Sequence, residues 1–449
     1  MRENWSREVT FLILNNIIKE GAYPAIEIRR SLNNTNLKNK DKALVTEIVN
    51  GTLRNLIKID WIIKKFIELR WDKVSSNIKN ILRCGVYQII FLDRVPDSAV
   101  CNECVELAKK YENIGASKFV NAVLRNISRG KNDIDKPDKS DIYEYLSVEY
   151  SHPLWLVKLW LKDLGIDFTT ELLKANNEVP PLTIRVNKLK TTKNELLSIL
   201  KSCDIITAEG LYNDEAVTIK GVSSLENMES FKKGYFQVQD ESSMLVGKVI
   251  DPKPGDFIID VCSAPGGKAT HLAEIMSNKG RIISRDIFSH KLRLIQENCK
   301  RLGITIIETE LFDAVDIDEN NLEKADTVLV DAPCSGLGLV RRKPDIRWRK
   351  RPEDLDKLPK LQLEILRKAS LYVKKSGVLV YCTCTINKKE NILVVKEFIK
   401  SSNNFELDNI FRFLPENLYA PNKKDGFLEL YPNTHKTDGF FIAKMVRKR

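Results

Sequence analysis

The stretch Thr327-Val-Leu-Val-Asp331-Ala-Pro-Cys334 decides the fold of this chain. Its apolar run is typical of a buried parallel strand that ends in the carboxylate of Asp331 and the thiol of Cys334. A second apolar run, in residues 377–385, ends in the same manner at Cys382 and Cys384. Open α/β sheets bind ligands at the edge where their parallel strands end. We therefore expect two strand ends to bring thiols together over one pocket.

Strands and helices alternate on both sides of this stretch, from residue 251 to the end of the chain. The expected strands are residues 257–261, 281–286, 304–308, 327–331, 378–384 and 439–446. The expected helices are residues 269–276, 289–302, 352–372 and 388–400. This alternation predicts an α/β doubly wound, Rossmann-like domain over residues 241–449.

The first 130 residues show helical periodicity throughout, with apolar stripes such as Val9, Leu12, Ile13 and Ile17. They predict an all-α bundle over residues 1–130. Residues 131–141 have almost nothing to bury, which predicts a linker. Residues 142–240 combine helical patterns with an alternating strand at 181–187, which predicts a small α/β module.

Two polar residues stand on the strand of that module, Arg185 and Asn187. Their side chains could contact a phosphate backbone. A solvated strand face explains them equally well, and the sequence leaves both interpretations open.

The charge balance points to a polyanionic partner. The 449 residues include 72 Lys and Arg against 61 Asp and Glu, a formal charge of +11. Phosphate contacts and counterion release favour nucleic acid as the partner of such a chain. Two basic clusters, at residues 341–343 and 347–351, adjoin the expected pocket. Their placement favours nucleic acid over a merely well-solvated surface.

Cysteine usage indicates a reducing compartment. The nine cysteines have no regular spacing and no signal sequence precedes them, so we expect reduced thiols in a cytoplasmic protein. No apolar run approaches the roughly 18 residues of a membrane span, so we expect no membrane association. Cys101 and Cys104 form a CxxC pair on a helical pattern without a second pair, which predicts helix packing and no metal site.

A second motif, Asp260-Val-Cys262-Ser-Ala-Pro265-Gly266-Gly267-Lys268, lies between the first expected strand of the large domain and its helix. It is neither GxGxxG nor the phosphate loop GxxxxGK[ST]. The glycine pair allows a ligand to approach the backbone at a helix N-terminus. About twenty residues further on, Asp286 ends the second strand, where it would accept hydrogen bonds from a ribose diol. The spacing suits a nucleoside-containing cofactor.

Several carboxylates specify that cofactor further. Asp313, after the third strand, is placed to bond an adenine amino group, and nearby carboxylates would favour the charge of a sulfonium. Together these features predict a site for S-adenosylmethionine. Lys268 would either neutralise one carboxylate or orient the loop. The expected cofactor-binding residues are Cys262, Ser263, Ala264, Pro265, Gly266, Gly267, Lys268, Asp286, Asp313 and Asp331.

The helical region resembles the NusB-like RNA-binding fold of antitermination factors. The matching segments are Asp41-Lys-Ala-Leu-Val-Thr-Glu-Ile-Val-Asn-Gly51, Ile81-Leu-Arg-Cys-Gly-Val-Tyr-Gln-Ile89 and Lys118-Phe-Val-Asn-Ala-Val-Leu-Arg125. The resemblance implies binding of RNA or of an RNA-associated protein. A helical bundle without such a role remains the alternative.

From about residue 145 to the end, the chain resembles the RNA cytosine-C5 methyltransferases of the Sun/Nop type. Four motifs carry this resemblance: Cys262-Ser-Ala-Pro-Gly-Gly-Lys268, Asp331-Ala-Pro-Cys-Ser-Gly336, Arg341-Arg-Lys-Pro-Asp-Ile-Arg-Trp348 and Asp438-Gly-Phe-Phe-Ile-Ala-Lys444. Combined with the NusB-like region, the resemblance implies a monomer that methylates a cytosine of small-subunit (16S) ribosomal RNA. The substrate would be either naked RNA or an assembly intermediate.

The family chemistry requires two thiols and an acid. The resemblance implies that the Cys384 thiolate adds to cytosine C6, that Cys334 assists release, and that Asp331 stabilises the activated base. On chemistry alone, Cys334 is a rival nucleophile, because DNA cytosine-C5 methyltransferases attack with a Pro-Cys thiol. Cys382 and Arg285 depart from the family pattern, which bears only on the shape of the pocket.

The expected RNA-binding residues are Arg341, Arg342, Arg347 and Trp348, which would hold phosphates and a neighbouring base. A charged surface loop packed by Trp348 is the alternative. Two other functions remain open: methylation of tRNA instead of ribosomal RNA, and a non-catalytic RNA-binding or antitermination factor with a vestigial cofactor fold.

Overall fold

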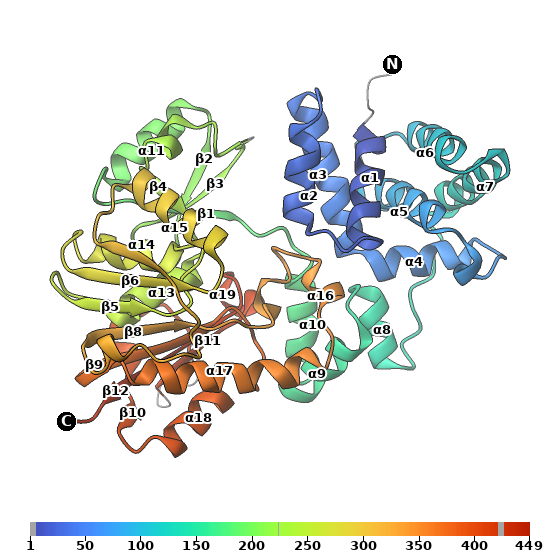
Figure 1. Ribbon diagram of the computed structural model, residues 1–449. Coiled ribbons are helices and arrows are strands. Elements are labelled where there is room, and N and C mark those ends of the chain that lie inside the picture. Colours follow the sequence, from blue (N-terminus) through green and yellow to red (C-terminus); the bar gives the residue numbers. More distant parts are fainter. Residues whose placement is uncertain (1–5, 223, 421–425) are drawn as a thin grey trace. The chain divides into compact units, whose positions relative to one another are not determined.

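The computed structural model describes residues 6–222, 224–420 and 426–449 (Figure 1). Its contacts divide the chain into two compact units. Unit 1 contains the chain up to Asn177 together with Lys343–Arg349, and unit 2 contains Glu178–Arg342 and Lys350–Arg449. No helix among the described residues is both long and apolar enough to cross a membrane.

Unit 1 is helical, which confirms the predicted all-α bundle. Its long helices are α1 (Ser6–Ile18), α2 (Pro24–Asn33), α3 (Asn39–Arg54), α4 (Leu56–Lys65), α5 (Ser76–Phe91), α6 (Asp97–Tyr111), α7 (Ile114–Gly130), α8 (Ile142–Glu149), α9 (Leu154–Leu164) and α10 (Ile166–Ala175). The core forms where apolar stripes of α1 and α3–α7 meet. Val9, Ile13 and Ile17 are buried as expected, whereas Leu12 is 40% exposed and lies off the stripe. Cys101 and Cys104 are buried in the face of α6, so both pack in the core.

Helices α8–α10 pack with unit 1 and not with the module that follows them. Residues 131–141 contain no helix or strand, in keeping with the expected linker, but the contacts divide the chain only after Asn177. Helix α8 packs on α4, the Ile57 amide donates to Ser151 Oγ (2.9 Å), and Lys58 pairs with Glu149 (3.1 Å). These contacts attach α8 and the residues that follow it to the helical bundle.

The small module of unit 2 is an antiparallel four-stranded sheet of order β2-β3-β1-β4. Its elements are β1 (Leu182–Val186), α11 (Lys193–Ser202), β2 (Ile206–Glu209), β3 (Ala216–Lys220), α12 (Glu229–Lys232) and β4 (Phe236–Val238). A capping box between Thr192 and Glu195 starts α11. The sequence predicted β1 and α11 but not β2–β4, which are too short to show a clear period.

Arg185 and Asn187 lie inside unit 2, which contradicts both interpretations of these residues. Each is 0% exposed. Arg185 forms two bonds to Glu274 on α14 (Gly267–Ile275), at 2.7 and 3.0 Å, and donates to the Gly267 carbonyl (2.9 Å). Asn187 donates to the carbonyls of Gly234 (2.8 Å) and Leu302 (2.9 Å). The two side chains attach the small module to the large sheet domain.

The large sheet has the order β10-β12-β9-β8-β5-β6-β7, with β11 paired to β12. Its strands are β5 (Phe257–Asp260), β6 (Arg281–Asp286), β7 (Ile307–Leu311), β8 (Ala325–Asp331), β9 (Val373–Thr383), β10 (Phe405–Leu407), β11 (Phe427–Leu430) and β12 (Phe440–Arg447). Strands β5–β9 are parallel, and β12 runs antiparallel to β9. The order reverses between β5 and β8, which places a topological switch point at their carboxyl ends.

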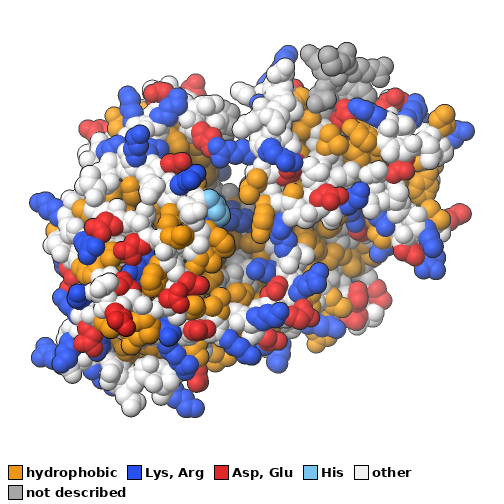
Figure 2. All heavy atoms as spheres, viewed as in Figure 1, with side chains coloured by type: hydrophobic (Ala, Val, Ile, Leu, Met, Phe, Trp, Pro, Cys, Tyr) orange, Lys and Arg blue, Asp and Glu red, His pale blue; other side chains and the backbone are white. Residues whose placement is uncertain are grey.

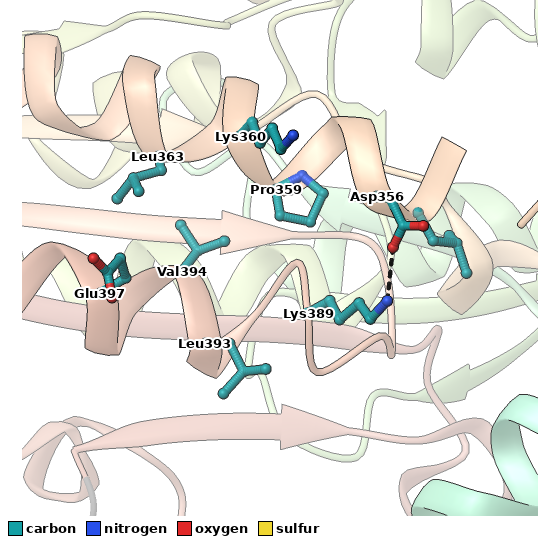
Figure 3. A pocket seen from close by; sticks show the side chains of 9 residues that line it. Asp356, Pro359, Lys360, Leu363, Lys389, Leu393, Val394 and Glu397 are labelled. Atoms are coloured by element: carbon teal, nitrogen blue, oxygen red, sulfur yellow. Dashed lines mark hydrogen bonds and ion pairs between the residues drawn. The ribbon is translucent and has the colours of Figure 1, made fainter. Parts of the chain in front are cut away.

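Helices cover both faces of this sheet, as the doubly wound prediction requires (Figure 1). Successive residues of a strand point to opposite faces, so Ile258 joins the core beneath α13 (Glu241–Ile250), α14 and α15 (Ser289–Leu302), whereas Ile259 joins the core beneath α17 (Asp354–Ser370) and α18 (Ile392–Ser401). Helices α17 and α18 leave a shallow groove between them, at one end of which Lys389 pairs with Asp356 at 2.7 Å (Figure 3).

We predict that Arg185→Met destabilises unit 2 by about 3–5 kcal/mol, because it leaves the Glu274 carboxylate buried without its partner. Hydrogen exchange of α14 peptides in increasing urea measures this loss. The control is Arg281→Met, which breaks an exposed pair with Glu308 and should cost less than about 1 kcal/mol. Equal losses in both variants would contradict the prediction.

Candidate active site

The ends of β8 and β9 bring two thiols into contact. The strands are parallel with Asp331 opposite Cys382, and the Ala332 amide donates to the Cys382 carbonyl at 3.0 Å. Beyond this pairing, the sulfur atoms of Cys334 and Cys384 lie 3.2 Å apart. A disulfide bond would be about 2.0 Å long, so both residues are thiols. The predicted convergence of the two thiols is confirmed.

The two thiols are only partly buried, so a substrate can reach them. The hydrogen bond with Cys384 and burial raise the pKa of Cys334 well above its usual value, and the charges of Glu390 and Asp331 add to this effect. Cys334 therefore keeps its proton at neutral pH.

Asp331 is held by two neighbours. Lys268 Nζ lies 2.6 Å from Asp331 Oδ2, and the Cys382 thiol donates to Oδ1 at 3.5 Å. Burial alone would lower the pKa of Lys268, but the charge of Asp331 raises it above its ordinary value, so Lys268 stays protonated. Of the two roles considered for Lys268, neutralisation of a carboxylate is the one that this geometry shows. Cys382, where the family often has Ser, still supplies a donor.

The loop from Asp260 to Lys268 leads from β5 into α14. Gly266 has φ +92°, a conformation that favours glycine, and an added Cβ would come within 3.2 Å of Ile295. A Cβ on Gly267 would meet nothing within 4 Å, so this residue faces open space. The backbone of the loop is fixed by the Ser263 amide, which donates to the Arg285 carbonyl (2.8 Å). The loop thus offers a ligand close access to the helix N-terminus.

Four carboxylates surround the side chain of Cys262. Burial is the largest cause of the raised pKa of this thiol, which lies well above its usual value. The charges of four carboxylates raise it further, namely those of Asp260, Asp331, Asp286 and Asp313. Asp286 ends β6 and accepts a hydrogen bond from the Phe288 amide (3.0 Å), and Asp313 is exposed in the loop after β7. The structure thus brings together the predicted carboxylates, which come from different strand ends.

Sequence reasoning did not select Asp260 as a site residue. Asp260 is fully buried, and neither of its oxygens has a hydrogen-bond partner within standard distance and angle among the residues that the structure describes. Burial and the charge of Asp331 raise its pKa to about 7, although the Ser263 hydroxyl and the Cys262 amide lie close enough to lower it. A buried carboxylate without a well-formed hydrogen bond fits a cationic ligand. Its position at the end of β5, directly before the loop, was the signal that could have identified it.

Two exposed apolar residues beside Asp286 were also missed. Ile287 is 50% exposed and Phe288 is 45% exposed, directly after the carboxylate that ends β6. Exposed apolar side chains at the ligand edge of a sheet suit a planar ring. The signal in the sequence was the apolar pair Ile-Phe in an otherwise polar turn.

The structure gives Arg341 and Arg342 protein partners. Arg341 is 3% exposed and donates to Asp438 (3.3 Å) and to the Lys436 carbonyl (2.9 Å). Arg342 pairs with Asp438 (2.7 Å) and with Asp240 (3.0 Å), and its side chain is 27% exposed. Arg341 is therefore too deeply buried to contact RNA, whereas part of the Arg342 side chain remains exposed.

Arg347 and Trp348 belong to unit 1, where they fix the segment Lys343–Arg349. Arg347 is 0% exposed and donates to the Ser151 carbonyl (2.9 Å) and to Asn177 Oδ1 (3.0 Å), among other acceptors. Burial lowers its pKa to about 9. Trp348 Nε1 donates to the Leu53 carbonyl at 2.7 Å. Arg347 cannot hold a phosphate here, which corrects the expectation and favours the alternative of a packed loop.

The fold and the site together define a class of protein. A doubly wound sheet with a glycine loop and carboxylates at its switch point, and with thiols at the next strand ends, is the arrangement of a methyltransferase that uses a nucleoside cofactor. Models of known families agree with this class. The family described as 16S rRNA methyltransferase RsmB/F matches residues 247–446, the NusB family matches residues 4–129, and the RsmF/B-like ferredoxin-like domain matches residues 152–226.

The chain belongs to the RsmB/F family of 16S rRNA methyltransferases. It is 39% identical to the probable ribosomal RNA small subunit methyltransferase B of Bacillus subtilis (strain 168), over 100% of both chains. It is 33% identical to the protein of the same name from Synechocystis sp., over 98% of this chain and 99% of that one. The chain is therefore an RNA methyltransferase that uses S-adenosylmethionine, as its sequence predicted.

Solved structures show the same fold. The crystal structure of the protein PH0851 matches 98% of this chain and 97% of its own, with a TM-score of 0.82 and 27% identity. A methyltransferase homolog protein from Pyrococcus horikoshii matches 69% of this chain and 99% of its own, with a TM-score of 0.60 and 27% identity.

We predict that Asp260→Asn stabilises the cofactor-free protein increasingly as pH rises. With its pKa raised to about 7, Asp260 keeps its proton in the folded chain above pH 4, where the unfolded chain has lost it. The contribution of Asp260 to the free energy of unfolding therefore falls as pH rises from 4 to about 7. The variant has no carboxyl group at this position, so it does not lose this contribution.

Urea unfolding at several pH values between 5 and 8, followed by circular dichroism, measures the effect. The difference between the two proteins should grow up to pH 7 and reach on the order of 3 kcal/mol. The control Asp313→Asn removes an exposed carboxylate and should change the free energy of unfolding less than Asp260→Asn does. A difference for Asp260→Asn that stays constant with pH would refute the prediction.

Proposed function

We propose that this enzyme transfers the methyl group of S-adenosylmethionine to C5 of a cytosine in small-subunit (16S) ribosomal RNA. The observation that carries the proposal is the contact of 3.2 Å between the Cys334 and Cys384 sulfur atoms, next to the strand that ends in Asp331. Two adjacent thiols and an acid suit chemistry on a carbon that needs covalent activation.

Cytosine C5 is a poor nucleophile, so a thiolate must first add to C6. Addition of the Cys384 sulfur forms a carbon–sulfur bond and moves the electron pair of the C5–C6 double bond towards C5. The cofactor supplies an electrophilic methyl group. C5 bonds to it while the bond to the sulfonium sulfur breaks. The C5 proton then passes to water, its electron pair restores the C5–C6 double bond, and the Cys384 sulfur leaves with the electrons of the carbon–sulfur bond.

The assignment of the two thiols follows the resemblance to the RNA cytosine-C5 methyltransferases, which places the attack at Cys384, and the raised pKa of Cys334 agrees with it. Cys334 has a strongly raised pKa and keeps its proton, so it suits a proton donor better than a nucleophile. From 3.2 Å its S–H can donate to the Cys384 sulfur as that sulfur leaves. We therefore assign attack to Cys384 and assistance of release to Cys334.

Asp331 would bond N3 or the exocyclic amine of the cytosine and stabilise the activated ring. Lys268 occupies its Oδ2, which orients the carboxylate. Asp286 would bond the ribose diol of the cofactor, Ile287 and Phe288 would pack on the adenine, and Asp313 would bond its amino group. Asp260, buried and without a well-formed hydrogen bond, would suit the positive charge of the cofactor.

The proposed substrate rests on the curated relatives, which carry the name of small-subunit ribosomal RNA methyltransferases, and on the NusB family match. The target base must leave its stack to reach the thiols. Of the predicted RNA contacts, Arg342 remains a proposal because part of it is exposed. Lys and Arg side chains lie across the face in Figure 2 with acidic side chains between them, so on this face phosphate contacts would be dispersed. We infer a monomer that acts in the cytoplasm.

Small-subunit RNA from cells that lack this protein should contain one unmethylated cytosine that is methylated when the protein is present. Bisulfite sequencing of ribosomal RNA and tRNA from both strains detects it, because C5 methylation protects cytosine from deamination. Purified enzyme and S-adenosylmethionine should restore the methyl group in vitro. A site found only in tRNA, or no protected cytosine at all, would contradict the proposal.

The two cysteines should differ in what their loss does. Cys384→Ala removes the nucleophile, so we expect neither turnover nor a covalent complex. Cys334→Ala leaves the attack intact but slows release, so we expect a stable protein–RNA complex on a denaturing gel. The surface substitution Cys203→Ala, far from the strand ends in sequence and exposed, serves as the control. The reverse pattern would exchange the two roles.

A further inference from the structure

A buried glutamate, Glu390, lies directly behind the two thiols. It is 0% exposed and stands in the turn between β9 and α18. Its carboxylate accepts four hydrogen bonds: from the Ser335 amide (2.7 Å), the Ser335 hydroxyl (2.5 Å), Gln362 Nε2 (3.1 Å) and Asn387 Nδ2 (2.9 Å). All four donors are neutral, and together they fill the acceptor capacity of a carboxylate.

These bonds reach both thiol-bearing strand ends. Ser335 follows Cys334 directly, and Thr385 follows Cys384 directly. The hydroxyl oxygens of Ser335 and Thr385 lie 2.8 Å apart. Because Ser335 gives its proton to Glu390, Thr385 must donate to Ser335. The carboxylate thus fixes the direction of a hydrogen-bond chain that ties one strand end to the other.

The rest of the environment fixes Glu390 itself. Tyr381 on β9 donates to the Glu390 carbonyl at 2.6 Å. Gln362 on α17 also donates to the Pro333 carbonyl (2.9 Å), so one amide holds both the carboxylate and the loop before Cys334. Helices α17 and α18, of which α17 carries Gln362 and α18 follows Glu390, pack side by side (Figure 3). A glutamate held by four hydrogen bonds at its carboxylate and one at its backbone carbonyl has little freedom to move.

We propose that Glu390 is a positioning residue that holds the Cys334 and Cys384 sulfur atoms at reacting distance. This inference rests on the proposed function of the two thiols. Its hydrogen bonds reach the two strand ends through Ser335 and, from there, through Thr385. Its negative charge also disfavours a second thiolate at Cys334.

The test is Glu390→Gln, which keeps the shape of the side chain. It replaces one carboxylate oxygen, which accepts hydrogen bonds, with an NH2 group that would face the existing donors. We expect kcat to fall about 100-fold, as for reacting groups displaced by about 1 Å, with KM for RNA and for S-adenosylmethionine within about twofold of wild type. The control Glu397→Gln changes an exposed carboxylate on α18, the helix that follows Glu390, and should leave kcat unchanged (Figure 3).

A second measurement does not depend on methyl transfer. Mild oxidation should join Cys334 and Cys384 of the wild type in a disulfide, because their sulfur atoms are already in contact. Peptide mapping by mass spectrometry should show this bond forming several-fold more slowly in Glu390→Gln. If the wild type forms the disulfide but methylates no cytosine, the proposed function fails while the comparison of rates still decides the role of Glu390.

If Glu390→Gln does not fold by circular dichroism, Ser335→Ala takes its place. It removes the hydroxyl link to Thr385 but keeps the amide bond to Glu390, and the same fall in kcat and in the rate of disulfide formation is expected. A folded variant with wild-type kcat, or one that loses kcat while the disulfide forms at the wild-type rate, would overturn the proposal.

Discussion

The parallel pairing of β8 with β9 is the constraint on which the active site depends. This pairing sets Asp331 opposite Cys382, and the residues just beyond the paired segment are the two thiols. A slip of one residue would turn every side chain of a strand to the other face of the sheet. The apolar alternation within β8 and β9 prevents such a slip, because Val328 and Leu329 belong to different cores. The register of a buried sheet thus determines the geometry of a reaction at its edge.

Buried polar groups hold the loops and side chains that the strand register does not position. Arg185 joins the small module to α14 and to the carbonyl of Gly267 in the cofactor loop. Lys268 holds the Asp331 carboxylate, and Glu390 holds the turns that carry the thiols. Arg185 and Glu390 are each satisfied by several partners at once. Such groups impose one arrangement, because any displacement would leave a buried charge without its bonds.

Much of this arrangement could be predicted from the sequence. The long periodic helices of unit 1 and the apolar strands β5, β6, β8 and β9 carry strong local signals, and the strand-ending residues marked the site. Short strands such as β10 and β11 have too few residues for a period. The predictions for Arg185 and Arg347 were wrong. A basic residue on a strand or in a loop looks the same in the sequence whether its partner is a phosphate or a buried carboxylate or carbonyl. Glu390 became visible only when burial and partners were known, since nothing local distinguishes it from a solvated acid, whereas Asp260 ends a strand as Asp286 and Asp331 do and could have been selected.

The central claim is that Cys384 attacks the base while Cys334 assists release. The most direct test is to incubate the wild-type enzyme and S-adenosylmethionine with substrate RNA in which 5-fluorocytosine replaces cytosine, so that release from C5 is blocked. The trapped complex is then digested and the modified peptide identified by mass spectrometry. The account predicts that the nucleotide is attached to Cys384. Attachment to Cys334, or the absence of any attached nucleotide while ordinary RNA is methylated, would contradict it.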